Sequence, residues 1–200
     1  MDSFLFQNES ELDLAKRDTQ NWEWVRPTDI LKSATFDDPN SPANYELKAG
    51  KYTSRKFLNA ITLLSPNAHY RNLFVDCDHM EMGYVACQFY KNGEWIYVLI
   101  DTQIPYSFQR KQFLFSSLEQ SNFFWLSLLE KAYAKLNGKY SNINQLGLKE
   151  TIADLCNGYV STVDLESDSK ASYIESFRLF HSLLNLVGTN KGYLVGCIKK

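Results

Sequence analysis

Residues 121–140, SNFFWLSLLEKAYAKLNGKY, are the stretch that decides the fold of this chain. Apolar side chains recur in it at the i, i+3, i+4, i+7 spacing of an amphipathic helix: Trp125, Leu128, Leu129, Ala132 and Leu136. Ser121 or Asn122 can cap its start, and Gly138 stands where helices often end in the left-handed conformation. The pattern predicts a core-packing helix of about four turns. We expect its charged residues to face water: Glu130, Lys131 and Lys135.

The amino-acid sequence of this helix is more informative than its periodicity alone. A Phe-Trp pair leading into LLEKAYAKLNGKY resembles the helix in the protease core of calpains, which are papain-like, calcium-dependent cysteine proteases. Any buried helix could share the periodicity, but LEKAYAKLNG is a longer and more specific string than periodicity requires. Three other segments resemble calpains in the same order: 21–31 (NWEWVRPTDIL), 83–105 (GYVACQFYKNGEWIYVLIDTQIP) and 192–200 (GYLVGCIKK).

The resemblance implies an α+β fold, the first, mainly helical lobe of a papain-like calpain core with a small antiparallel β-hairpin. We expect this lobe to occupy residues 21–200, preceded by an N-terminal arm over residues 1–20. In calpains the catalytic His and Asn belong to a second lobe. That second lobe is expected to be absent from this chain, because the last recognisable strand is where the sequence stops.

Local signals predict the other elements. Residues 51–64 form a helix ended by Ser65-Pro66, residues 69–82 form an irregular link, and Asn92-Gly93 turns a hairpin between strands 84–90 and 95–100. A second helix spans 147–160 and ends at Asn157-Gly158. The next helix lies within 173–187, and a short strand follows at 193–198. The inward side chains expected on that last helix are Ile174, Phe177, Phe180, Leu184 and Val187.

Composition sets limits on function. The 200 residues and 44% hydrophobic content suit one globular domain or two small lobes. A net charge of −2 gives no basic surface for nucleic acid. No run approaches the roughly 18 apolar residues that cross a membrane, and the polar N-terminus does not read as a secretory signal. The 4 cysteines are widely spaced, which favours reduced thiols in a cytoplasmic protein.

In calpains the motif around the nucleophile is Q-G-x-L-G-D-C-W, and an apolar helix follows it. The apolar register of that helix matches Ala60, Ile61, Leu63 and Leu64, and counting back without gaps places residues 49–56 on the motif. Gly50 is retained, whereas Ala49 replaces the oxyanion glutamine. Arg55 replaces the cysteine and Lys56 replaces the tryptophan. Arginine stays protonated and has no lone pair to offer as a nucleophile, so the motif is degenerate.

Other nucleophiles and ligands are weaker candidates. A one-residue slip would place Ser54 at the nucleophile position, without an oxyanion glutamine to assist it. Cys77, followed by Asp78 and His79, could form a dyad or part of a metal site, but such sites need three or four convergent ligands. His69 lies in the irregular link, and His181 is expected to be packed or at a helix edge.

The resemblance also raises the question of calcium, which calpain core lobes bind through carbonyl oxygens and acids. One family acid precedes the nucleophile by nine residues, and the matching position here is Glu46. The other matches Ser161, which carries no charge; Asp164 and Glu166 lie nearby and could replace it only if the loop shifted. No cofactor is therefore expected, with calcium left open.

These observations predict a catalytically inactive calpain-like domain, a pseudoprotease that acts as a protein-binding or scaffolding module. Two alternatives stay open: a hydrolase that uses Ser54 or Cys77, and a regulatory lobe that pairs with an active calpain-like protease. Family knowledge points toward a cytoplasmic protein with a cytoskeletal or ciliary partner. Nucleic acid and a membrane span are not expected.

Overall fold

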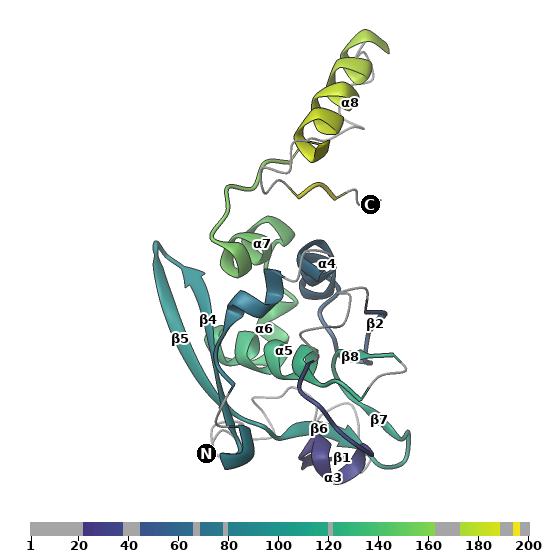
Figure 1. Cartoon of the computed structure of the whole chain (residues 1–200), viewed down its shortest axis with the longest axis vertical. Coiled ribbons are helices and arrows are strands. Elements are labelled where there is room, and N and C mark those ends of the chain that lie inside the picture. The colour runs from purple at the N-terminus through teal and green to yellow at the C-terminus, as the bar shows by residue number, and fades with distance from the viewer. Residues whose placement is uncertain are drawn as a thin grey trace. The chain divides into compact units, whose positions relative to one another are not determined.

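The computed structural model of the chain describes residues 22–37, 45–65, 69–77, 80–119, 122–162, 173–188 and 194–196 (Figure 1). The chain divides into two compact units between Tyr159 and Val160, and each is described here by itself. The expected N-terminal arm lies outside the described residues. So do Asp78, His79, Asp164 and Glu166.

Helix α5, Trp125–Leu136, is the centre of the first unit, as the sequence predicts (Figure 1). Every residue from Trp125 to Ala134 is buried. The helix begins after Phe124 with no side-chain cap, so Asn122 does not cap it, and Ser121 lies outside the described residues. Gly138 does follow the helix with φ +89°, a left-handed conformation that favours glycine.

The expected exposure of the charged side chains of α5 is wrong. Glu130 and Lys131 are fully buried, and Lys135 is half-buried. The helix is enclosed because it contacts β4 and β5 on one side and α6, β6 and β8 elsewhere. Its polar side chains therefore form hydrogen bonds with residues of other segments instead of facing water.

Helix α4, Arg55–Leu64, confirms the predicted helix but starts four residues later than predicted, directly after the cap Ser54. Its inward face is Phe57, Ala60, Ile61 and Leu64, and Ser65 ends it as expected. The ring of Phe57 stacks on Tyr133 of α5 with ring centroids 5.6 Å apart. Three more short helices are described in this unit: α3 (Pro27–Ile30), α6 (Tyr140–Ile143) and α7 (Leu148–Cys156), of which α7 packs against α4.

The predicted hairpin is confirmed as β4, Tyr84–Lys91, paired antiparallel with β5, Glu94–Asp101. Its turn residues have positive φ angles, 55° at Asn92 and 92° at Gly93, which suit the tight Asn-Gly turn. The inner face carries Val85, Cys87, Phe89, Val98 and Ile100 toward α5 and α7.

The predicted irregular link, 69–82, is more ordered than expected. It contains two short 3-10 helices, His69–Leu73 and Met80–Met82, and strand β3, Phe74–Asp76. Strand β3 pairs with β4, so the hairpin is part of a sheet ordered β3-β4-β5. The strand was missed because it is short and interrupted by a register shift.

Two further small antiparallel sheets are present that the sequence did not predict. Strands β1 (Trp22–Val25), β6 (Ile104–Ser107) and β7 (Gln112–Phe113) form one sheet in the order β1-β6-β7. Strands β2 (Leu47–Lys48) and β8 (Ser117–Leu118) form the other. The first unit is thus an α+β fold, as expected.

The second predicted helix is confirmed as α7, which ends at Asn157 in the left-handed conformation. In the second unit, α8 spans Tyr173–Gly188. Two of its residues expected to face inward are instead half-exposed, Phe180 at 56% and Leu184 at 51%. The described part of the predicted final strand, 194–196, is not a strand.

Candidate functional site

The N-terminus of α4 is the place where the motif comparison puts the calpain nucleophile. Ser54 caps this helix: its hydroxyl accepts a hydrogen bond from the Phe57 N–H at 3.4 Å and donates one to the Ile143 carbonyl at 3.2 Å. The residue is buried. A serine whose proton is held by a carbonyl and whose oxygen caps a helix is poorly placed to attack a substrate.

The two cations of the motif behave differently. Arg55, the first residue of α4, is exposed, and among the described residues it forms no ion pair. Lys56 instead donates to the carbonyl oxygens of Asn144, at 3.3 Å, and Leu146, at 2.7 Å. Lys56 therefore holds the segment after α6, whereas the side chain of Arg55 is exposed.

Gly50, the retained motif residue, has a packing role in this chain. A Cβ atom at this position would lie 2.2 Å from the carbonyl oxygen of Phe115, which is a severe clash. The Gly50 N–H donates to the Thr53 hydroxyl at 3.0 Å, which folds the loop before α4. Ala49, at the oxyanion-glutamine position, is exposed and has no side-chain donor.

Glu130 of α5 is a buried residue beside the α4 cap that the sequence reasoning placed on the solvent side. Its carboxylate accepts the Ser54 N–H at 3.2 Å and the Ser116 N–H at 2.7 Å, so it joins the α4 cap to the loop before β8. Burial raises the pKa of Glu130 from 4.5 to about 6, although these hydrogen bonds act in the opposite direction. Only a three-dimensional contact reveals this role, because Glu130 is 76 residues from Ser54 in sequence.

Lys131, the next residue, is bound to the end of the hairpin. Its ammonium contacts the Asp101 carboxylate, donates to the Gln103 carbonyl at 2.9 Å, and lies 4.9 Å from the centroid of the Trp24 ring. This buried cation has a full set of partners, as burial of a charge requires. It joins α5, β1 and the β5–β6 connection.

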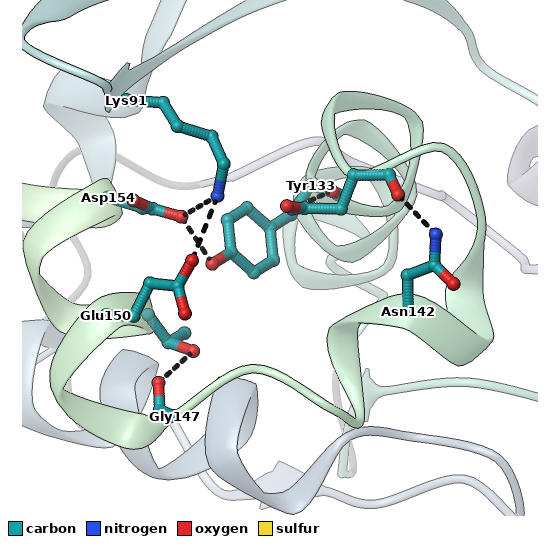
Figure 2. A network of polar contacts seen from close by, with 8 residues as sticks. Lys91, Tyr133, Asn142, Gly147, Glu150 and Asp154 are labelled. Carbon is teal, nitrogen blue, oxygen red and sulfur yellow. Dashed lines mark hydrogen bonds and ion pairs between the residues drawn. The ribbon is translucent and has the colours of Figure 1, made fainter.

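A third polar cluster joins the hairpin to α7 (Figure 2). Asp154 accepts hydrogen bonds from the Tyr133 hydroxyl at 2.8 Å and from Lys91 at 2.9 Å, and Lys91 also lies 3.4 Å from Glu150. Burial and the Asp154 carboxylate raise the pKa of the Tyr133 hydroxyl well above its usual range. Every charged group in Figure 2 has a partner, so we interpret this cluster as a structural link.

Two cysteines and two histidines remain as candidates among the described residues. Cys77 follows β3 and is half-buried, and Cys87 on β4 is fully buried, which raises the pKa of its thiol well above the usual range. His69 is half-buried, whereas His181 on α8 is exposed rather than packed. Among the described residues, no three His, Cys, Asp or Glu side chains converge as metal ligands would.

The two calcium positions that the resemblance implies lie in different units of the chain. Glu46 is exposed, and its backbone carbonyl accepts the Glu119 N–H at 2.9 Å. Ser161 is exposed and belongs to the second unit. A calcium site takes six to eight oxygen ligands, so calcium binding stays an open prediction, and we derive no chemistry through the ion.

The α+β lobe built around a central helix, with a capped helix beside it, is the architecture of a papain-like protease lobe. A family model described as "Calpain family cysteine protease" matches residues 2–200. The chain therefore belongs to the calpain family of cysteine proteases.

Individual relatives agree with this assignment. Calpain-8 of Rattus norvegicus is 32% identical over 184 residues, which are 90% of this chain and 24% of that protein. Calpain-8 of Homo sapiens is 36% identical over 152 residues, 74% of this chain and 21% of that protein. The calpain-type cysteine protease ADL1 of Oryza sativa subsp. japonica is 29% identical over 179 residues, 87% of this chain and 8% of that protein. The chain thus spans less than a quarter of each of these relatives.

No helix in the described ranges has both the length and the apolar character that a membrane crossing would need.

Proposed function

We propose that this calpain-family chain is a pseudoprotease, a protein-binding or scaffolding module without peptidase chemistry. The feature that carries the proposal is Arg55, which ungapped counting along the sequence assigns to the nucleophile position of the motif and which is the first residue of α4. A guanidinium cannot attack a carbonyl, and its charge opposes the helix dipole that would favour a thiolate at this position.

The surroundings of Arg55 support the same reading. The hydroxyl of Ser54, the nearest alternative nucleophile, is buried and hydrogen-bonded on both its donor and acceptor sides. Lys56 holds two carbonyl oxygens at the position where the family motif has tryptophan. This end of α4 is therefore organised for structural rigidity, with Arg55 exposed beside it as a group that can bind a partner's carboxylate.

The outer face of the hairpin supports a binding role. Three alternate residues of β5 point away from α5 and are exposed: Trp95 at 41%, Tyr97 at 66% and Leu99 at 55%. Exposed apolar residues that gather on one face commonly mark a protein-interaction surface. The carbonyl of Leu99 accepts a hydrogen bond from Lys135 at 2.6 Å, so this end of the β5 edge is already occupied. A partner would accordingly contact the face of the sheet rather than extend it at that end.

The partner and location are proposals of the same kind. A protein partner with an apolar contact surface suits the face formed by Trp95, Tyr97 and Leu99, and a cytoplasmic, cytoskeletal or ciliary setting follows from the family resemblance alone. A regulatory lobe that pairs with an active calpain-like protease would use the same surfaces. It differs only in the identity of the partner.

The experiment is affinity capture of the tagged full-length protein from its native extract, with mass spectrometry of the bound proteins. A triple variant, W95S/Y97S/L99S, is compared with a control triple variant at exposed polar positions, N59S/Q109S/N144S. The proposal predicts stable partners that the first variant loses and the control retains. An active protease among those partners would support the regulatory alternative. Peptidase activity that belongs to the chain itself would refute the pseudoprotease.

A further inference from the structure

A pocket of about 450 Å³ lies in the first unit and shares no residue with the motif at 49–56. It opens between five segments: the start of α3, the loop at 34–36, the 3-10 helix Met80–Met82, the β5–β6 connection at Thr102 and the residue before α5. Two aromatic and two charged residues are among those that line it: Phe36, Phe124, Arg26 and Glu81. Its volume is within the range of about 300–1,000 Å³ that small-molecule sites have.

The apolar floor of this pocket is fixed by backbone hydrogen bonds. The Trp125 N–H donates to the Phe36 carbonyl at 3.2 Å, and the Thr35 N–H donates to the Asn122 carbonyl at 3.0 Å. These bonds hold the rings of Phe36 and Phe124 edge to face, with centroids 6.0 Å apart. The floor is therefore formed before any ligand arrives, which lowers the entropic cost of binding.

Two opposite charges stand at the rim. Arg26 and Glu81 both line the pocket and are both exposed, and within the described ranges neither takes part in an ion pair, including with the other. Space for the guanidinium is provided by Gly83, where a Cβ atom would lie 3.1 Å from Arg26 Nη2. A cation and an anion that flank an aromatic floor without pairing with each other can each receive a complementary ligand group.

From this arrangement we propose that the pocket binds a free amino acid with a large apolar side chain. The ligand carboxylate pairs with the guanidinium of Arg26, its ammonium group pairs with the carboxylate of Glu81, and its side chain packs on Phe36 and Phe124. A ligand with both charges is favoured over a simple acid or amine. A simple acid would leave the carboxylate of Glu81 without a ligand partner, and a simple amine would leave the guanidinium of Arg26 without one. Because this pocket is separate from the degenerate motif, the inference does not depend on the proposed function.

The test uses three named probes on the intact chain, measured by isothermal titration calorimetry: L-phenylalanine, 3-phenylpropanoate and 2-phenylethylamine. The last two lack the ammonium group and the carboxylate respectively. The proposal predicts that L-phenylalanine binds about tenfold more tightly than either analogue. Equal affinity for all three, or no heat of binding for L-phenylalanine at millimolar concentration, would overturn it.

Charge-removing variants assign each contact. Arg26→Gln should weaken the binding of L-phenylalanine and of 3-phenylpropanoate about tenfold and leave the affinity for 2-phenylethylamine unchanged. Glu81→Gln should weaken the binding of L-phenylalanine and of 2-phenylethylamine and leave 3-phenylpropanoate bound no more weakly. Arg26→Lys, which keeps the charge, guards against a folding effect at this position. Glu94→Gln, an exposed carboxylate that does not line this pocket, is the matched control. Variants that alter none of the three affinities would refute the assigned contacts.

Discussion

The buried carboxylate of Glu130 makes the stability of this fold depend on pH in a defined direction. Two backbone N–H groups stabilise its ionised form, while complete burial opposes ionisation, and burial is the larger effect, so that the pKa rises from 4.5 to about 6. A carboxyl whose pKa is higher in the folded state binds a proton more tightly there than in the unfolded chain. Its contribution to stability is therefore fully present below about pH 4.5 and is lost as the pH rises through about 6.

The size of this effect follows from the two pKa values. A difference of about 1.5 between the folded and unfolded pKa corresponds to about 2 kcal/mol of unfolding free energy. In Glu130→Gln this dependence disappears. At pH 4.5 the folded parent already carries a protonated Glu130, which the neutral amide resembles, so we expect the variant to lie within about 1 kcal/mol of the parent at that pH. Because only the parent loses this contribution as the pH rises, the variant should gain about 2 kcal/mol relative to the parent between pH 4.5 and pH 7.5.

The assay is urea denaturation of both proteins at intervals across this pH range, followed by far-ultraviolet circular dichroism. The control for the substitution itself is Glu94→Gln, an exposed position where a change of within about 0.5 kcal/mol is usual. A stability of Glu130→Gln that stays constant relative to the parent across this pH range, or that falls relative to the parent as the pH rises, would refute the reasoning. In that case the two hydrogen bonds would outweigh burial.

Two further substitutions test the packing. Gly50→Ala should lower the unfolding free energy by at least about 2 kcal/mol, because its Cβ would lie 2.2 Å from a carbonyl oxygen. Gly147→Ala, whose Cβ would have no atom within 4 Å, should change the unfolding free energy little. Thermal unfolding of the two variants compares them, and equal losses would contradict the clash. Lys131→Met should cost about 3 kcal/mol because it leaves Asp101 without its buried partner, and Asp101→Asn in the same chain should recover part of that loss. If the double variant were no more stable than Lys131→Met, as chemical denaturation would reveal, the unpaired charge would not be the cause.

The elements that the sequence predicted well are those specified by nearby residues. The Asn92-Gly93 turn lies within the hairpin that it joins, and the stop at Ser65 and the left-handed Asn157 are likewise local signals. Strands of two to four residues, such as β2 and β8, were not predicted because each is stabilised by a partner far along the chain. No periodicity develops within so short a segment.

The same distinction applies to the candidate site. Ser54, Arg55 and Lys56 could be placed by counting along the motif, because α4 has a clear apolar register. The burial of Glu130 and Lys131 could not, since a charged residue between apolar ones is normally assigned to the solvent side of a helix. Their partners come from segments that only the folded chain brings together.

The central claim is that this calpain-family chain carries no peptidase chemistry, and the most direct test is turnover of a fluorogenic peptide. The natural full-length protein is assayed with and without calcium, beside Ser54→Ala and Cys77→Ser variants and a known active calpain. We predict no turnover above the buffer rate in either condition, and no difference among the variants. Calcium-dependent cleavage that either substitution abolishes would contradict the claim and identify the nucleophile.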